Sequence, residues 1–309
     1  MFILTAEKSH LSIDINLNKC YNSNKTGHPR PHKITRRIDL TTFTSEDLKA
    51  VLDNNPDLVK EAPYHPGYED AAMNMSDKGY EEANLADAIR FNMRREGKRF
   101  WAGDNISDYL HKGDKEILIN EATEAFEKVL DTLLIDREND PNSKGTARRL
   151  AKMYYNEIMG GRYDPAPDAT AFPNDSEDRY EGMLVVRSEL RSMCSHHHQP
   201  VSGVAYIGII AANKLIGLSK YTRIAQWCAR RGTLQEELCN DIAREIMKAT
   251  ESENIGVYIE AQHGCCLNRG IMAHSSLTQT TVLKGAFLKD PGTKKEFFDN
   301  IQLQSRNGN

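Results

Sequence analysis

The sequence has no long hydrophobic run and few aromatic residues. Only 7% of its 309 residues are aromatic, and two of these are tryptophans. No apolar stretch approaches the roughly 20 residues that a transmembrane helix requires. Polar residues follow the first four at once, so the apolar core of a signal peptide is missing as well. We therefore expect a cytoplasmic protein that does not bind a membrane.

An excess of positive charge is also missing. The formal net charge is −4, from 40 basic and 44 acidic residues. A surface with this balance is not a general platform for nucleic acid, and interleaved basic and aromatic residues are absent too. We therefore disfavour a zinc-stabilised nucleic-acid module. An anionic ligand would have to be held by a local basic cluster.

Cysteine is too sparse for a disulfide framework. The chain has six cysteines, and without a secretion signal these are expected to be reduced thiols. Cys228 and Cys239 fall in amphipathic helical patterns and are predicted to be core residues. The remaining pattern of interest is the pairing of Cys194 with Cys265 and Cys266, each beside histidines.

The first 115 residues form a predicted N-terminal extension. They are polar, they are broken by turn signals such as Asn54-Asn55-Pro56, and they contain no catalytic constellation. The pattern predicts mostly helix and loop, with short helices near 45–53 and 80–96. The expected role is packing on the core or assembly.

Residues 116–309 form a second predicted domain with sharper periodicity. An apolar helical stripe is followed by a helix over 146–159 and a loop over 160–181. The stripe consists of Phe126, Val129, Leu130, Leu133 and Leu134. A final short helix is predicted after Thr293, which would cap it.

Strands and helices in this domain follow the order two strands, two helices, two strands. This order predicts an α+β fold with an antiparallel four-stranded sheet covered by helices on one face. The strands are predicted at 183–190, 201–210, 255–262 and 276–286, and the helices at 219–231 and 233–250.

Cysteine and histidine recur at the ends of two predicted strands. Cys194 and His197 are separated by two residues, a usual spacing for zinc ligands, and Cys265 is expected to close the third strand. Two thiolates and an imidazole can hold zinc and leave one position for water. Cys266 competes with Cys265, because alternate strand residues point to opposite faces, and the pattern alone does not choose between them.

Two further histidines lie inside these segments. His196 and His263 can serve as acid and base groups, since histidine titrates near neutral pH. Alternatively, they only support the metal ligands through hydrogen bonds. Zinc nucleobase deaminases are excluded, because their His-x-Glu and Pro-Cys-x-x-Cys motifs are absent.

A basic segment predicts a phosphate site. Ser219 has the position of a helix N-cap, and Lys220 and Arg223 share one side of the first turn. Free N–H groups with two cations suit a phosphate, and Arg269 could add a third. The alternative is a solvated basic face.

Gln235 and Glu236 allow two interpretations. With Thr233, Glu236 has the spacing of a capping box, which needs no further role. A carboxylate beside a carboxamide can also pair with the N1–H and amine of guanine.

Together these motifs resemble the GTP cyclohydrolase I family over about 116–309. The likeness also includes an earlier helix that begins near Thr146. The motifs are Thr146–Tyr154, Ser192-Met193-Cys194-Ser195-His196-His197, Gly217-Leu218-Ser219-Lys220-x-x-Arg223-Ile224, Leu234-Gln235-Glu236-x-Leu238 and Glu260-Ala261-x-His263-x-Cys265-x-x-x-Arg269-Gly270.

The resemblance implies a tunnelling fold whose sheets join into a toroidal barrel. Such proteins are commonly homo-oligomers, decamers of two pentamers, with active sites between subunits. The implied reaction converts GTP and water to 7,8-dihydroneopterin triphosphate and formate, by attack of zinc-bound water on C8. Folate, biopterin and 7-deazaguanine synthesis all begin with this step.

The resemblance also implies residue roles. Cys194, His197 and Cys265 would be the zinc ligands, and His196 and His263 would transfer protons. The implied substrate-binding residues are Ser219, Lys220, Arg223, Gln235, Glu236, Arg269 and Arg149, the last from a neighbouring subunit. Ser195 stands where the family usually has glutamate, which favours one alternative: a non-catalytic tunnelling-fold protein that binds GTP or a pterin.

Overall fold

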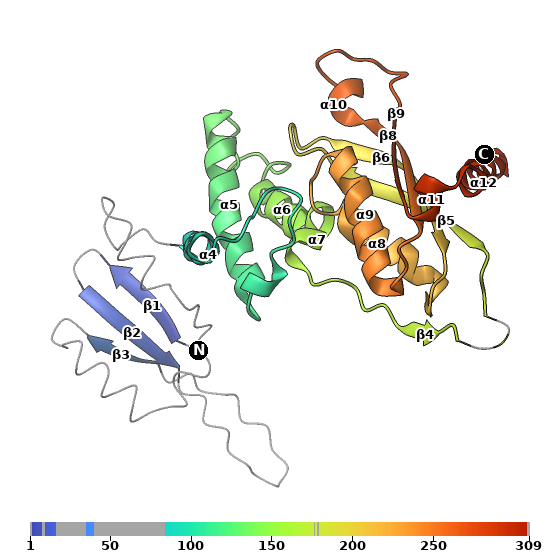
Figure 1. Ribbon diagram of the computed structural model, residues 1–309. Coiled ribbons are helices and arrows are strands. Elements are labelled where there is room, and N and C mark those ends of the chain that lie inside the picture. The colour runs from blue at the N-terminus through green and yellow to red at the C-terminus, as the bar shows by residue number, and fades with distance from the viewer. Residues whose placement is uncertain are drawn as a thin grey trace, which may run out of the picture. The chain divides into compact units, whose positions relative to one another are not determined.

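The computed structural model describes residues 84–175, 177 and 179–307, and the backbone of three strands nearer the N-terminus (Figure 1). The chain divides into two compact units. One consists of Met1–Arg95 with His111–Asp114, and the other of Glu96–Leu110 with Lys115–Asn309. Among the described residues, no helix has the length and apolar character needed to cross a membrane.

The first unit contains a three-stranded antiparallel sheet and a helix. The strands β1 (Phe2–Glu7), β2 (His10–Asn16) and β3 (Thr35–Asp39) pair in that order. These strands depart from the expectation of mostly helix and loop, and the period-2 alternation of β2 was the signal for them. Helix α4 (Leu85–Arg95) confirms the helix expected near 80–96. The one expected near 45–53 lies outside the described residues.

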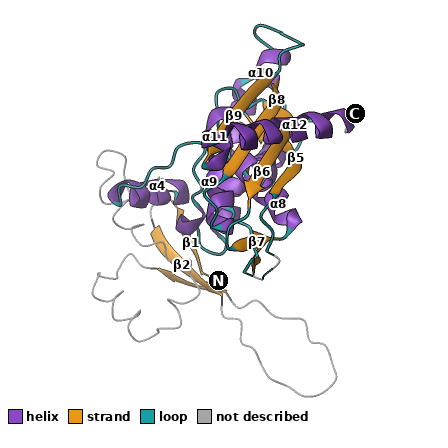
Figure 2. Cartoon of the chain, turned by 45° about the vertical axis from the view of Figure 1, so that its right-hand side comes forward, coloured by secondary structure: helices purple, strands orange, loops and turns teal. Residues whose placement is uncertain are grey.

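The second unit is built on a four-stranded antiparallel sheet, as the sequence predicts. Its strands are β5 (Met183–Met193), β6 (Pro200–Ile210), β8 (Ile255–His263) and β9 (Thr278–Lys284), in the order β5-β6-β8-β9 (Figure 2). A separate pair, β4 (Ala171–Pro173) with β7 (Lys214–Ile216), puts a short strand into the segment expected to be a loop.

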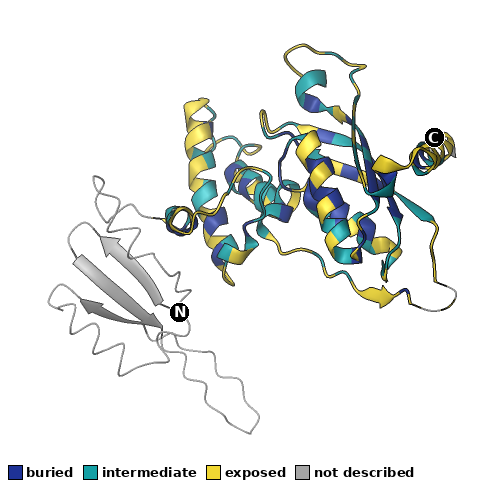
Figure 3. Ribbon diagram, viewed as in Figure 1, coloured by how far each residue is buried: buried dark blue, intermediate teal, exposed yellow. Residues whose placement is uncertain are grey.

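Two helices cover one face of this sheet. Helix α8 (Leu218–Ala229) packs on β5, and α9 (Gln235–Thr250) packs on β8 and β9. Alternate strand residues such as Ile207 and Ile259 point into the interface and are fully buried, as Figure 3 shows for this layer. Burying each such side chain contributes about 1.5–3 kcal/mol to stability.

A second apolar cluster lies on the opposite face, around α11 (Ala286–Lys289) and α12 (Pro291–Asn307). Phe287 and Phe297 reach the sheet there because Gly208 has no side chain: a Cβ at that position would lie 2.6 Å from the Phe297 ring. The C-terminal helix is longer than predicted. The helix begins at Pro291, and Asp290 rather than Thr293 caps it, since the Asp290 carboxylate accepts the Thr293 N–H at 2.6 Å.

Helix α5 (Asp114–Thr132) carries the predicted apolar stripe, but the chain does not bury most of it. Leu130 is buried, whereas Val129 and Leu133 are exposed, and Leu134 lies past the helix end at 92% exposure. The face of α5 that packs within the chain instead contains Leu118 and Ile119. The helix is thus confirmed, and the stripe is left as an apolar surface.

The predicted helix over 146–159 is present in two parts. Helix α6 (Thr146–Lys152) continues as a π-helical segment, Met153–Ile158, labelled η2. A short helix, α7 (Gly160–Tyr163), follows it, and a 3-10 turn, η1 (Ser107–Tyr109), precedes α5 in the chain.

Candidate metal and substrate site

Two thiols and one imidazole lie together at one end of the four-stranded sheet. The ligand atoms of Cys194, His263 and Cys265 all lie within 4.8 Å of one another. With Zn–S bonds of about 2.3 Å and Zn–N bonds of about 2.0 Å, a tetrahedral zinc ion needs two sulfurs and one nitrogen roughly 3.5–3.8 Å apart. The group therefore has the right chemistry for zinc, and a small adjustment of side chains gives the right size.

The strand pairing explains why these residues meet. Cys194 directly follows β5, and its backbone N–H donates to the carbonyl of Gln199 at 2.9 Å, which closes the turn into β6. His263 ends β8 and pairs with Val201 at the start of β6. Both segments thus reach the same end of the sheet.

The sequence predicted that Cys265 ends the third strand, and this is wrong, because β8 ends at His263. Cys265 lies in α10 (Gly264–Leu267), a helical turn that follows β8 beside the upper end of the sheet in Figure 1. The strand alternation invoked for Cys265 and Cys266 does not apply in a helical turn, and their sulfur atoms are 4.0 Å apart. Only Cys265 belongs to the metal-binding group.

The other two histidines predicted to belong to the site, His196 and His197, lie in the exposed turn after Cys194. The rings of His196 and His197 are 6.3 Å apart, edge to face, and neither belongs to the group of three. Ser195 is half-buried in the same turn. The structure thus gathers two of the three predicted ligands, together with the histidine assigned to proton transfer.

Burial shifts the protonation of Cys265. It raises the pKa of the Cys265 thiol to about 11, and the neighbouring thiols of Cys194 and Cys266 act in the same direction. Cys265 is therefore protonated at neutral pH without a metal. Metal binding must displace this proton, so the affinity rises with pH.

Gln235 determines which nitrogen of His263 carries the hydrogen. Its amide Nε2 donates to the carbonyl of Thr278 at 3.1 Å and to the hydroxyl of Thr280 at 3.2 Å, which fixes the amide orientation. The amide oxygen then faces His263 Nε2 at 2.7 Å and can only accept. Nε2 must therefore donate, and in the neutral ring Nδ1 keeps its lone pair.

Burial also lowers the pKa of His263, although Glu236 opposes this shift. The neutral ring is therefore favoured at neutral pH. Gln235 itself is buried, and each polar atom of its side chain has a partner within the chain.

The capping box expected at the start of α9 is not formed. The helix begins at Gln235 behind Leu234, which makes no side-chain cap, and the Thr233 hydroxyl bonds instead to Glu237 at 2.9 Å. The carboxylate of Glu236 is exposed. It remains available to a ligand near His263.

The predicted phosphate residues lie at the start of α8. Gly217 is the N-cap, so Ser219 is the second helical residue rather than the cap. Ser219 and Arg223 are exposed and Lys220 is half-buried.

Two further predicted substrate residues lie elsewhere. Arg269 is exposed after α10. The guanidinium of Arg149 donates to the carbonyls of Asn142 and Lys144, each at 3.0 Å.

The metal group and this phosphate segment are far apart in one chain. The Ser192 hydroxyl donates to the carbonyl of Ala229 at 2.7 Å, so the C-terminal end of α8 lies beside the end of β5 that leads to Cys194. Ser219 lies ten residues earlier, about 15 Å along the helix axis. The two sets therefore lie toward opposite ends of α8 within one chain.

Comparisons with known proteins agree on one family. A profile of the family described as GTP cyclohydrolase I matches residues 122–302. The chain is 40% identical to GTP cyclohydrolase 1 of Flavobacterium johnsoniae over 181 residues, which is 58% of this chain and 80% of that protein. It is 36% identical to the Buchnera aphidicola protein of the same name over 194 residues, 61% of this chain and 85% of the relative.

Proposed function

The chain belongs to the GTP cyclohydrolase I family, and we propose that it converts GTP and water to 7,8-dihydroneopterin triphosphate and formate. One observation carries the proposal to this chain: Cys194, His263 and Cys265 lie together at the end of the sheet. GTP is a metabolite of the cytoplasm, where we propose that the enzyme works.

Zinc is the metal that we propose for this group. Cys194 and Cys265 supply two thiolates. For the imidazole we propose His197, as the family resemblance implies, although the structure places His263 and not His197 beside the two thiols. When bound, zinc provides Lewis acidity at an open coordination position. The donor set of sulfur and nitrogen is the one that zinc prefers.

The other polar residues transfer protons or bind the guanine ring. His263, neutral and with Nδ1 free, accepts a proton, while His196 protonates N7 of guanine. Glu236 accepts hydrogen bonds from the N1–H and amine of guanine. Gln235 holds His263 in its tautomer.

The triphosphate is held by residues from more than one chain. Ser219, Lys220 and Arg223 of one subunit face the metal group of another, because within a chain Ser219 lies about 15 Å along α8 from Ala229, the residue beside the strand that leads to Cys194. Arg269 follows the metal group itself, and Arg149 comes from a further subunit.

Exposed features support a toroidal decamer with the tunnelling fold. Within the described residues, β5 and β9 each have one free edge, and a free strand edge is a template for pairing with another chain. The exposed apolar side chains of Val129 in α5 and of Leu133 and Leu134 just after it offer a second surface for contact with another chain.

The proposal predicts formate and, after oxidation, fluorescent neopterin phosphate when purified protein is given GTP. A strong chelator abolishes both products, and zinc restores them. Binding of GTP without formate by the zinc-loaded protein would instead favour the non-catalytic alternative.

The roles of His197 and His263 can be distinguished by the zinc content of their alanine variants. His197→Ala is expected to lose most of the zinc bound per chain, because one of three protein ligands is removed. His263→Ala is expected to keep zinc and lose formate release. The measurement is zinc per chain by elemental analysis. The reverse result, zinc lost only in His263→Ala, would make His263 the third ligand.

The role of Gln235 can be read from a split between kcat and KM. Gln235→Met removes the acceptor for His263 Nε2, and kcat is expected to fall about 10- to 100-fold. KM for GTP should stay within about twofold, because this side chain is engaged within the protein. Gln302→Met, at an exposed position of α12, is the control. A raised KM with unchanged kcat would contradict this role.

A further inference from the structure

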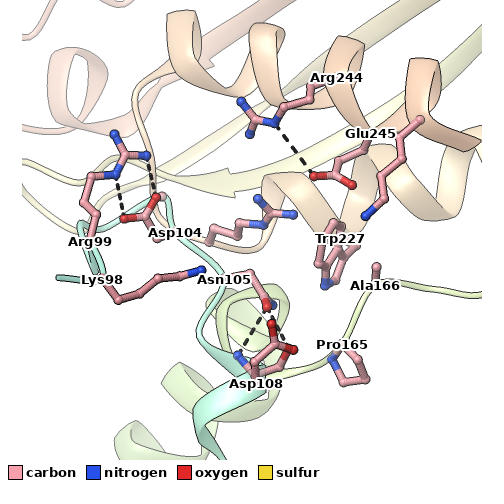
Figure 4. Close-up of a pocket in the computed structure, with 14 residues that line it drawn as sticks. Lys98, Arg99, Asp104, Asn105, Asp108, Pro165, Ala166, Trp227, Arg244 and Glu245 are labelled. Atoms are coloured by element: carbon pink, nitrogen blue, oxygen red, sulfur yellow. Dashed lines mark hydrogen bonds and ion pairs between the residues drawn. The ribbon is translucent and has the colours of Figure 1, made fainter. Parts of the chain in front are cut away.

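A cavity of about 410 Å³ lies apart from the cysteine and histidine residues of the proposed active site. Its walls come from the segment before α5, from Pro165 and Ala166, from α8 and the turn after it, and from α9 (Figure 4). None of the residues that line it belongs to the proposed metal or GTP site. Its volume is in the range of small-molecule sites, about 300–1,000 Å³.

One wall of this cavity is fixed by hydrogen bonds. The guanidinium of Arg162 donates to the carbonyls of Ala102 and Asp104, at 3.0 and 2.9 Å. The side chain of Asn105 donates to the carbonyls of Gly161 and Asp164, at 2.9 and 2.7 Å. The segment that carries Lys98 and Arg99 is thus held in place before any ligand arrives.

Positive charge exceeds negative charge around the cavity. Five cationic residues line it, against three carboxylates; the cations are Lys98, Arg99, Arg231, Arg244 and Lys248, and the carboxylates are Asp104, Asp108 and Glu245. Arg99 is paired with Asp104 through two hydrogen bonds of 2.6 and 3.0 Å, and Arg244 pairs with Glu245 and with Asp241, which lies outside the lining (Figure 4).

Two of these cations have no carboxylate partner. Within the part of the chain that the structure describes, neither Lys98 nor Lys248 lies within ion-pair distance of an acidic group. They come from different elements, Lys98 from the fixed segment and Lys248 from α9. Figure 4 shows the Lys98 side chain extended along the cavity toward Asn105.

The lining also contains a buried guanidinium. The Arg231 side chain is 4% exposed, stacks on Trp227 with its carbon 3.8 Å from the ring centroid, and lies 3.6 Å from Asp241. Its Nε has no hydrogen-bond partner. Asp241 also pairs with Arg244, so this one carboxylate is shared by two guanidinium groups, which leaves a positive potential at this end of the cavity.

We propose that this cavity binds a small phosphomonoester, with its phosphate between Lys98 and Lys248. Lysine is a strong point-charge partner for phosphate, and two lysines without carboxylates match a dianion. The volume accommodates a phosphate with a small organic group. The site is separate from the triphosphate residues Ser219, Lys220 and Arg223 and does not depend on catalysis.

Calorimetric titration of the full-length protein tests this. Arg223→Ala serves as the background, so that the proposed GTP site contributes less to phosphate binding. Inorganic phosphate and glycerol 3-phosphate are the two probes, and a tighter fit for the ester is the expected result. Equal affinity for both probes would overturn the ester assignment, and no binding of either would overturn the site.

Paired variants locate the binding. Lys98→Ala with Lys248→Ala is expected to weaken ester binding at least about tenfold, since two charge-assisted contacts are lost. Lys289→Ala with Lys294→Ala, two exposed lysines near the C-terminal helix, should leave it unchanged. In the otherwise natural chain, the first pair should also leave KM for GTP unchanged. Unchanged ester affinity in the first pair, or a loss in the second, overturns the proposal.

Discussion

Cys194→Ser is expected to reduce formate release from GTP by at least about 10³-fold. The thiol belongs to the group of three ligand atoms within 4.8 Å, and its loss leaves too few ligands to hold zinc. Lewis-acid stabilisation of a transition state amounts to several kcal/mol, and each 1.36 kcal/mol is about tenfold in rate. The measurements are formate per GTP and zinc per chain.

The neighbouring cysteine provides a matched control. Cys266 is next to Cys265 in α10, with its sulfur 4.0 Å away, but does not belong to the ligand group. Cys266→Ser should keep zinc and stay within a few-fold of the natural rate. An active Cys194→Ser enzyme, or equal losses in the two serine variants, would refute the ligand assignment.

Two inactive variants are expected to restore activity when their chains are mixed in one assembly. Cys194→Ser removes one proposed zinc ligand, and Arg223→Ala removes a proposed phosphate contact in the first half of α8, whose C-terminal end lies beside β5. If each site combines these residues from two chains, a random equal mixture leaves about a quarter of the sites intact. Co-expression with two different tags, purification on both and a formate assay measure this.

Recovery of activity in the mixed assembly depends on whether each site combines residues from two chains. Sites contained within one chain would give no recovery above the two parents, and that result would contradict the shared site. Light scattering on the same samples supplies the particle mass. A mass near 35 kDa, that of one chain, would contradict the assembly itself.

The sequence predicted the sheet well because its strands are long and bounded by clear turns. Strand β8 alternates strictly, with Val257, Ile259 and Ala261 buried on the face that packs against the helices. Such period-2 patterns depend on local residues and survive tertiary packing. The antiparallel order then follows from short connections between neighbouring strands.

Helix boundaries were predicted less well. Ser219, Thr233 and Thr293 were each expected to be caps, yet the helices begin one or two residues away from those positions. Several polar residues near a helix start can satisfy the same free N–H groups, so sequence alone does not choose between them.

Two features depended on long-range contacts that no local pattern contains. The partners of Gln235 lie 24 to 45 residues later, in β8 and β9, so its hold on His263 had no signal in the sequence. The exposed stripe of Val129, Leu133 and Leu134 has the helical period of a buried face. This period does not say whether the same chain or another chain covers the stripe.

The proposed reaction removes one carbon from GTP at the site that holds Cys194, His263 and Cys265. Purified, zinc-loaded protein should convert GTP labelled with ¹³C at C8 into labelled formate, one per GTP consumed. The NMR signal of C8 should disappear from the nucleotide at the same rate. A label that stays in the purine ring while the protein binds GTP would contradict the account.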